Sequence, residues 1–370
     1  MTDHLSGYSQ GDVKQALLAA GASGTIYSLV MPESEAVLTE VVDGGAAGRD
    51  AGFLEHYREA WTQKQDALHE GYFERWIAWS ALVVKFDAAA FPHRYPTAGA
   101  SEGIFKLMAE YAARARRENF APSIHIFDGE YEGFPAYAAS LGLALVRHAR
   151  SDWEAVAGRA DRHAQLWISQ PSAIDGTVWS HFDAFARRLA DTRPDVALVP
   201  DLTYVGNVAR AFEVAIDLPN VAHFVFSHSK PFGGYYHRVG GVFSREECPS
   251  LFGNKWFKNL LSLAWGSAMM DHYHVHELPR RYAGVQAEAA RRIGHSLGIE
   301  ALAPAEVNLL ATAPTGTSDS PLIETLYRGC AEERVIRLCA SPSMAALIDP
   351  KLAASTAPQL LARWKAEGLA

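Results

Sequence analysis

Between residues 100 and 245 the chain alternates short apolar runs with stretches of helical periodicity, and no other feature restricts its fold as much. From Ser101, a predicted helix N-cap, apolar residues recur at helical spacing as far as Ala115. Similar spacing covers residues 135–140 and 179–190. Short apolar runs are predicted as strands at residues 124–127, 143–147, 166–168, 196–199, 223–226 and 239–243. Strands separated by helices form βαβ units, so the sequence predicts an α/β protein with a mostly parallel sheet.

The two ends of the chain differ from this middle part. The pattern predicts a short helix at residues 13–20, strands at 307–311 and 335–338, and a terminal helix at 358–366. These elements predict a small α+β domain built from both chain ends. The domain assignment is residues 1–50 for an N-terminal arm and part of the small domain, 51–285 for a large domain, and 286–370 for the C-terminal small domain.

Composition excludes several classes of protein. The 370 residues are 49% hydrophobic and carry a net charge of −8 without a long basic run, which argues against nucleic acid or an anionic membrane as partner. Every apolar stretch is too short or too charged to span a bilayer, and the first residues do not resemble a secretory signal. Cys248, Cys330 and Cys339 lack metal-site spacing. We therefore expect a cytoplasmic globular protein.

A lysine follows one predicted strand, inside a short loop rich in serine and glycine. Residues 227–234 read Ser-His-Ser-Lys-Pro-Phe-Gly-Gly, and Arg238 lies eight positions after Lys230. A lysine amine in such a loop can reach an aldehyde, while serine hydroxyls and an arginine fork suit a phosphate. Ser227, Ser229, Lys230 and Arg238 are therefore candidates for a single binding site.

Other predicted strand ends supply complementary groups. Asp201 and Tyr204 follow the strand at 196–199, and the turn at 99–101 precedes a helix whose free N–H groups favour an anion. Tyr131 follows the strand at 124–127 and is either an aromatic face for a ligand or a simple core aromatic. Ligands of parallel sheets bind beyond the carboxyl ends of the strands, so these groups are expected to converge there.

The combined groups match what pyridoxal phosphate needs from a protein. A lysine amine forms an imine with its aldehyde, and a carboxylate keeps the pyridine nitrogen protonated so that the ring accepts electrons. A hydroxyl beside the ring oxygen, a phosphate cup and an aromatic face complete the set. The sequence therefore predicts pyridoxal 5′-phosphate as cofactor and an amino acid as substrate.

These motifs resemble those of the fold-type I, aspartate aminotransferase-like (class I/II) family of pyridoxal-phosphate enzymes, over roughly residues 90–245. The resemblance implies a doubly wound, mostly parallel seven-stranded sheet and a homodimer with shared active sites. It implies that Lys230 carries the imine and moves a proton, that Asp201 pairs with the ring nitrogen, and that Tyr204 contacts the ring oxygen. The residues it implies for the phosphate are Gly99, Ala100, Ser101, Ser227, Ser229 and Arg238, and Tyr131 is the candidate for stacking on the ring.

Two departures from the family pattern bear on the reaction. Where the family has a second asparagine that contacts the ring oxygen, this chain has Ala173, and Ser172 replaces that donor only if the loop shifts by one residue. The late arginine that holds the substrate carboxylate is best matched by Arg337. An acidic substrate requires a second arginine, for which Arg94 is a candidate.

The activity that the sequence favours is transamination between an amino acid and a 2-oxo acid. The alternative with the same cofactor is elimination, substitution or cyclisation on an amino acid, which Ala173 and the compact C-terminal part suggest. A third alternative is a regulatory or structural protein that keeps the fold without catalysis. His272, His274 and His276 raise the possibility of a metal, but surface or cleft histidines are the commoner outcome and no metal is predicted.

Overall fold

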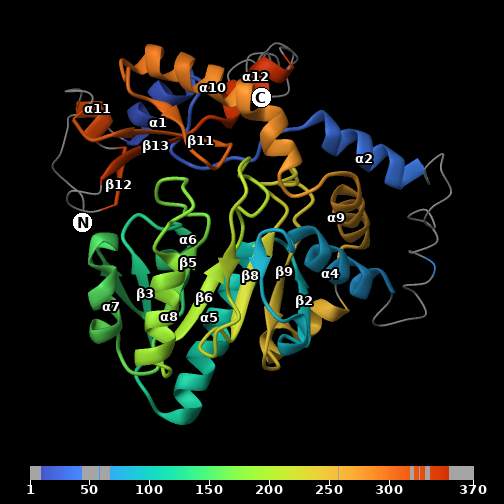
Figure 1. Ribbon diagram of the computed structural model, residues 1–370, viewed down its shortest axis with the longest axis vertical. Helices are drawn as coiled ribbons and strands as arrows, with labels where there is room; N and C mark the ends of the chain where they lie inside the picture. The colour runs from blue at the N-terminus through green and yellow to red at the C-terminus, as the bar shows by residue number, and fades with distance from the viewer. Residues whose placement is uncertain are drawn as a thin grey trace, which may run out of the picture.

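A computed structural model describes residues 10–43, 58, 67–256, 258–316, 321–324, 326–329 and 334–349 of the chain. These residues form a large central sheet flanked by helices and a smaller sheet above it, with helices of its own (Figure 1). The helix predicted at 358–366 lies outside the described residues. The domain boundaries after residues 50 and 285 stay predictions.

Within the described ranges, seven strands form the central sheet in the order β2-β9-β8-β6-β5-β3-β4. β9 runs antiparallel to both β2 and β8, and all other neighbours in the sheet are parallel. The predicted fold class, with a mostly parallel seven-stranded sheet, is confirmed. The strands are β2 (His93–Thr97), β3 (Ser123–Phe127), β4 (Ala144–His148), β5 (Gln165–Ser169), β6 (Ala197–Asp201), β8 (His223–Ser227) and β9 (Gly240–Ser244).

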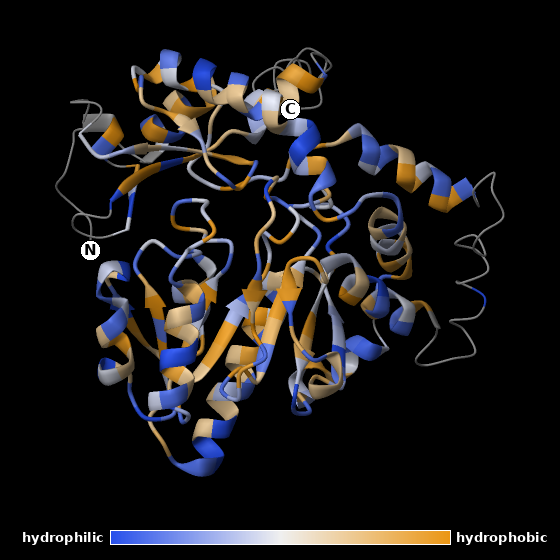
Figure 2. Cartoon of the chain, in the orientation of Figure 1, coloured by the Kyte–Doolittle hydropathy of each residue, from blue (hydrophilic) through white to orange (hydrophobic). Residues whose placement is uncertain are grey.

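Continuous burial explains why these strands read as unbroken apolar runs. All five residues of β3, β5 and β9 are buried, because helices cover both faces of the sheet. Figure 2 shows the hydrophobic strands inside and mixed colouring on the helices outside. The surrounding helices are α4 (Ala67–Ser80), α5 (Ala100–Glu118), α6 (Gly133–Ser140), α7 (Trp153–Arg159), α8 (Phe182–Thr192) and α9 (Leu260–His272).

Two helix starts differ from the predicted ones. α5 begins at Ala100 with Gly99 as N-cap rather than Ser101, since Gly99 has a φ of 82°, which side chains rarely allow. α8 begins at Phe182 rather than at residue 179, because the backbone N–H of Trp179 donates to the side chain of Gln170. In both cases a tertiary contact or a backbone angle, not helical periodicity, decides where the helix starts.

The smaller sheet is antiparallel and has the order β10-β11-β13-β12. Ser23, near the N-terminus, pairs with Cys339 on β13, so both chain ends contribute to this part, as predicted. The predicted strand at 307–311 starts later, because the N–H of Val307 donates to Gly176 of the large part. The elements here are α1 (Gln10–Ala19), α10 (Glu277–Leu297), β10 (Ala303–Pro304), β11 (Leu310–Pro314), α11 (Pro321–Glu324), β12 (Tyr327–Arg328), β13 (Val335–Cys339) and α12 (Ser341–Ile348).

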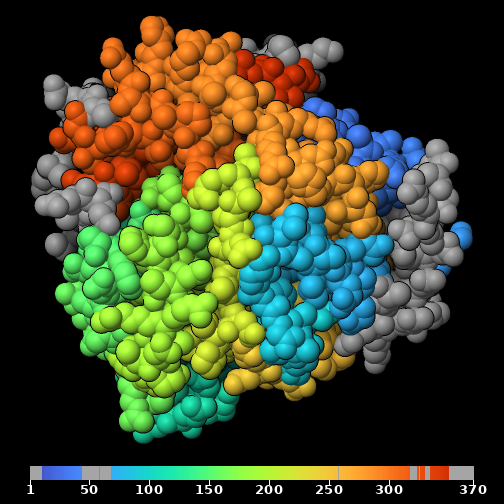
Figure 3. Space-filling view, viewed as in Figure 1, coloured from blue at the N-terminus to red at the C-terminus, as the bar shows by residue number. Residues whose placement is uncertain are grey.

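The carboxyl ends of the parallel strands face the smaller sheet. Since β2 and β8 are both antiparallel to β9, they run in the same direction as β6, β5 and β3. Thr97 and Ser227 pair with the same residue, Gly240, at this edge. Figure 3 shows the C-terminal residues, in orange and red, packed directly over this part of the molecule.

The remaining elements are short or peripheral. α2 (Pro32–Asp43) packs against α9, and β1 (Val84–Lys85) pairs with β7 (Val214–Ala215) in a separate two-stranded sheet. Short 3-10 turns comprise Ala88–Ala90, Arg150–Asp152 and Pro249–Lys255. None of the helices in the described ranges has the combination of length and apolar character that crossing a bilayer requires.

Candidate active site

The predicted phosphate residues converge where α5 begins. A Cβ atom on Gly99 would lie 3.2 Å from Nη2 of Arg238 and 3.4 Å from Oγ of Ser227, so the three residues enclose one small space. Nη2 of Arg238 also donates to the carbonyl of Ala98 at 2.7 Å. Arg238 itself has a φ of 49°, an unusual value for a residue with a side chain, which is tolerated where the surroundings fix the geometry.

Hydroxyl groups surround the same space. Oγ of Ser227 donates to Oγ of Ser229 at 3.0 Å and accepts from the N–H of Ser229 at 3.1 Å. Oγ of Ser101 lies 3.1 Å from the hydroxyl of Tyr131, and the first turn of α5 contains Ala100 and Ser101. Burial raises the pKa of Tyr131 to about 12, so its hydroxyl stays protonated. The residues predicted for a phosphate therefore lie at one helix N-terminus, with Tyr131 in contact.

Asp201 is the last residue of β6 and is 4% exposed. Its Oδ1 accepts hydrogen bonds from the N–H of Thr203 at 3.0 Å and from the Thr203 hydroxyl at 2.5 Å. Burial raises the pKa of Asp201 to about 6, although the Thr203 hydrogen bonds lower it. Both bonds use Oδ1, which fixes the carboxylate at the strand end.

A second buried carboxylate, Glu130, was not among the predicted residues. Its Oε2 accepts from the Ser169 hydroxyl at 2.6 Å, and its Oε1 accepts from the Ser169 N–H at 3.1 Å. Burial raises the pKa of Glu130 to about 7; its hydrogen bonds lower it, and the negative charge of Asp201 raises it. Ser169 lies directly beside Asp201 in the sheet register. The signal in the sequence was only that Glu130 precedes Tyr131 at a strand end.

Lys230 lies opposite the N-terminal segment of the chain. Its Nζ donates to the carbonyl of Ile26 at 2.5 Å, and its own carbonyl accepts from Nδ2 of Asn207 at 3.2 Å. Burial lowers the pKa of the Lys230 amine to about 8; Cys339 raises it, and the positive charges of Arg238 and Arg337 lower it. The amine is therefore closer to its neutral, nucleophilic form than an ordinary lysine.

Tyr204 and Arg337 are buried nearby. Burial raises the pKa of Tyr204 well above its usual range, and the charge of Arg337 lowers it. Arg337 is 1% exposed, and its Nη1 donates to the carbonyl of Ala173. Its Nη2 donates to the carbonyl of Gly24 at 3.3 Å, while its buried Nε has no hydrogen-bond partner among the described residues.

Arg337 thus contacts the position where the sequence pattern departs from the family. Ala173 provides a backbone carbonyl to Arg337, and its N–H donates to Oγ of Ser169 at 2.7 Å. Oγ of Ser172 accepts from Arg150 at 3.2 Å and from the N–H of Ile174 at 3.1 Å. These contacts hold the side chain of Ser172 toward Arg150, and its role beside the cofactor stays a prediction.

Solved structures share this architecture. YbdL from Escherichia coli, identified with a methionine aminotransferase function, is 15% identical, with 94% of this chain and 98% of that chain covered at a TM-score of 0.61. The PLP-bound C-S lyase from Staphylococcus hominis is 13% identical, with 89% of both chains covered at 0.62. L-threonine-O-3-phosphate decarboxylase from Porphyromonas gingivalis is 14% identical, with 88% and 97% covered at 0.53. This chain has the fold-type I architecture. Neither a family model nor a curated protein matches its sequence.

Two sets of residues that the sequence analysis considered, the three histidines and Arg94, have other partners in the structure. His272 pairs with Glu40 at 3.0 Å, whereas Nδ1 of His276 contacts the carbonyl of Val208 at 2.9 Å. Among the described residues, no group of three or more His, Cys, Asp or Glu is placed to hold a metal ion. Arg94 is on the amino-terminal half of β2, where it pairs with Glu74 of α4. It therefore lies away from the carboxyl edge of the central sheet.

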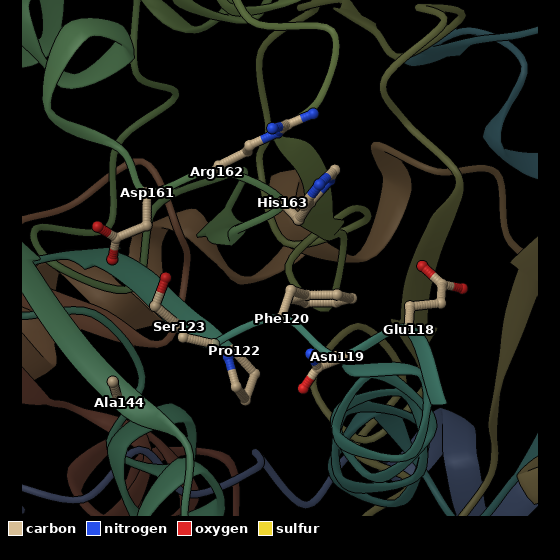
Figure 4. Close-up of a pocket in the computed structure, with 10 residues that line it drawn as sticks. Glu118, Asn119, Phe120, Pro122, Ser123, Ala144, Asp161, Arg162 and His163 are labelled. Atoms are coloured by element: carbon tan, nitrogen blue, oxygen red, sulfur yellow. The ribbon is translucent and has the colours of Figure 1, made fainter. Parts of the chain in front are cut away.

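A separate hollow lies at the opposite edge of the sheet (Figure 4). Its volume is about 600 Å³. The residues that line it include Glu118 at the end of α5, Ser123 at the start of β3 and Ala144 at the start of β4. The Asp161 carboxylate and the Ser123 hydroxyl on its wall both contact the buried ring of His125. The hollow lies at the amino ends of the parallel strands, whereas Lys230 follows the carboxyl end of β8. The hollow therefore does not belong to the Lys230 site.

Proposed function

We propose that this chain binds pyridoxal 5′-phosphate and acts on an amino acid at the α-carbon, and that its reaction is transamination with a 2-oxo acid. The observation that carries the proposal is the convergence of Lys230, Asp201 and the Gly99–Ser227–Arg238 cup at the carboxyl edge of one sheet. The neighbours with this fold include proteins named as aminotransferases, which favours the same class of reaction here.

The start of α5 and Arg238 would hold the phosphate. The free N–H groups at Ala100 and Ser101 and the helix dipole attract an anion, and the Ser227 and Ser229 hydroxyls add donors. Arg238 would supply the positive charge, with its Nη2 beside Gly99. The absence of a side chain at Gly99 keeps this space open, because a Cβ there would touch Arg238.

When bound, pyridoxal phosphate supplies an aldehyde that takes up the amino group and a ring that withdraws electrons from the α-carbon. Asp201, whose Oδ1 is bonded by Thr203, would hold the proton of the ring nitrogen with its other oxygen, and Tyr204 would donate to the ring oxygen. Tyr131, whose hydroxyl contacts Oγ of Ser101, would stack on the ring. Lys230, with its lowered pKa, removes and returns the proton at the substrate α-carbon.

Arg337 binds the α-carboxylate of the substrate in this proposal. Its guanidinium is buried, has an unpartnered Nε, and is held in place by the carbonyls of Ala173 and Gly24. A buried guanidinium without a full set of partners favours binding of an anion, and a carboxylate suits its planar fork. The positive charge of Arg337 contributes to the lowered pKa of Lys230, which supports a shared site for the two residues.

The proposal is tested by mixing the purified full-length chain with pyridoxal phosphate and recording the absorbance of the bound cofactor. We expect a spectral change that a Lys230→Ala variant lacks. An amino acid added without any 2-oxo acid should then convert the cofactor stoichiometrically to pyridoxamine phosphate. A wild-type spectrum equal to that of free pyridoxal phosphate contradicts the cofactor assignment.

A lyase, substitution or cyclisation reaction is the second candidate. It is favoured by Ala173, which supplies no side-chain donor beside the ring oxygen. Catalytic turnover of an amino acid without formation of pyridoxamine phosphate would support it. Product analysis with amino acids that carry a leaving group on the β- or γ-carbon separates it from transamination.

We also propose a homodimer with shared sites. Tyr235 and Tyr236 are 47% and 87% exposed in the loop that follows Lys230, and the guanidinium of Arg238 lies 5.4 Å from the ring of Tyr235. Exposed aromatic side chains beside a binding site are typical of interfaces. Light scattering should give twice the mass of the chain, and Tyr236→Asp should lower it; a monomeric wild type contradicts this proposal.

A further inference from the structure

A second arginine lies beside Arg337 in the smaller sheet. Nη2 of Arg328, on β12, donates to the carbonyl of Gly24 at 3.5 Å, and Nη2 of Arg337 donates to the same oxygen at 3.3 Å. The two guanidinium groups therefore share one acceptor and lie close together. Burial lowers the pKa of Arg337, and the positive charge of Arg328 lowers it further. Such a pair is stable only if anions compensate it.

Glu132 is the anion that the chain provides. Its Oε1 lies 2.5 Å from Nη2 of Arg328 and 3.5 Å from Nη2 of Arg337. Glu132 therefore forms ion pairs with both guanidinium groups, and the closer of the two is with Arg328. One carboxylate between two guanidinium groups leaves a single net positive charge, and the closer pairing with Arg328 leaves Arg337 the less compensated of the two.

The backbone fixes Glu132 in this place. Glu132 is the N-cap of α6, in the turn that follows β3, and Gly129 of this turn packs against Gly329 at the end of β12. A Cβ atom on Gly129, which has a φ of 89°, would lie only 2.5 Å from the backbone nitrogen of Gly329. The close approach of these two backbones holds Glu132 opposite Arg328.

We propose that Glu132 sets the substrate class of this site: by pairing with Arg328 it leaves only Arg337 for a carboxylate, so the enzyme prefers amino acids with an uncharged side chain over acidic ones. This inference rests on the proposed role of Arg337 in binding the substrate carboxylate. An acidic side chain near Arg328 meets the negative charge of Glu132 and is repelled, whereas a neutral side chain of the same size is accepted.

The test compares ligands of equal size that differ by one charge. Succinate and its monoamide, succinamate, are titrated by calorimetry into the full-length protein, and glutamate and glutamine are compared by the rate at which each changes the bound-cofactor absorbance. The wild type should prefer the neutral member of each pair. Glu132→Gln should raise the relative affinity for succinate, and the relative rate with glutamate, by about tenfold, as expected for one charge-assisted interaction.

Three further variants decide the origin of the effect. Asp128→Asn removes a carboxylate of the same turn, one that pairs with Arg147 at 3.1 Å, and should leave both ratios unchanged. The double variant Glu132→Gln/Arg328→Gln should lose the gain. Arg328→Gln alone should free Glu132 to compete for Arg337 and weaken succinamate binding, which remains a test if Glu132→Gln does not fold.

The inference is overturned if Glu132→Gln leaves the ratios at their wild-type values, if the gain persists without Arg328, or if the wild type prefers the acidic ligands. A wild type that binds no pyridoxal phosphate refutes the proposed function itself. A wild type that binds the cofactor and reacts with amino acids, but without the expected change in Glu132→Gln, refutes only the assignment of Glu132.

Discussion

The amine of Lys230 donates to the carbonyl oxygen of Ile26 at 2.5 Å, across 204 residues of sequence. This contact places the N-terminal segment over the lysine at the carboxyl edge of the central sheet. Gly24, two residues earlier, offers its carbonyl to Arg328 and Arg337. Two carbonyls of this short segment, those of Gly24 and Ile26, therefore bind the two guanidinium groups and the amine.

The first prediction concerns the pH dependence of cofactor attachment. The pKa of Lys230 is lowered to about 8, chiefly by burial, and only the neutral amine attacks an aldehyde. Below pH 8 the rate of reaction with pyridoxal phosphate should rise about tenfold per pH unit, and above pH 8 it should level off. Stopped-flow absorbance between pH 6 and 10 measures this, and a midpoint near the ordinary lysine value contradicts it.

The second prediction concerns stability and the buried pair Glu130 and Asp201. Burial raises their pKa values to about 7 and about 6, so between about pH 4.5 and 7 the folded chain binds protons that the unfolded chain has released. The stability of the cofactor-free protein should therefore fall as pH rises through this window. The loss from Glu130 alone is about 3 kcal/mol, from the size of the pKa shift.

Glu130→Gln tests this assignment, since an amide mimics the protonated acid at every pH. Denaturant titrations at pH 5 and pH 8 should differ less for Glu130→Gln than for the wild type, with the variant more stable at pH 8. Glu154→Gln on α7, an acid with no role in the site, is the control. An equal pH slope in all three proteins means that Glu130 is ionised in the fold.

The sheet was predicted correctly from the sequence, and the candidate site residues could be proposed from it, because both depend on local patterns. The strands are continuous apolar runs, and Asp201, Lys230 and the Gly99 turn each directly follow or precede such an element. Lys230 and Arg238 belong to one loop, so their separation in space is limited by their separation in the chain. Residues of this kind can be identified from the sequence without knowledge of the tertiary structure.

The residues that were missed act through contacts between distant parts of the chain. Glu130 is bonded to Ser169, 39 residues away, and its pKa is raised by burial, whereas the Ser169 hydrogen bonds lower it. Arg328 and Glu132 meet across the two sheets. Arg94, the predicted second arginine, pairs instead with Glu74, whereas Arg328 lies beside Arg337. Helical or strand periodicity carries no information about such pairings, because they depend on how the two parts of the molecule pack.

The third prediction concerns Arg337. Arg337→Lys keeps the positive charge but cannot reach the carbonyls of Ala173 and Gly24 together or present a planar fork to a carboxylate. The KM for the amino acid should rise by about tenfold to a hundredfold, corresponding to about 2 kcal/mol, while the affinity for pyridoxal phosphate changes little. Arg147→Lys, at a surface ion pair, is the control. A normal KM in Arg337→Lys removes this residue from substrate binding.

The last prediction concerns Gly99, whose missing side chain keeps the phosphate cup open. A Cβ at Gly99 would lie 3.2 Å from Arg238 and 3.4 Å from Ser227, whereas a Cβ at Gly142, which also has a positive φ of 68°, would meet nothing within 4 Å. Gly99→Ala and Gly142→Ala should therefore both lose about 1 kcal/mol or more of stability from backbone strain. Only Gly99→Ala should also weaken the binding of pyridoxal phosphate, by about tenfold or more, because Arg238 must move away from the phosphate. Fluorescence titration of both variants with the cofactor decides the matter, and equal affinities would mean that the phosphate binds elsewhere.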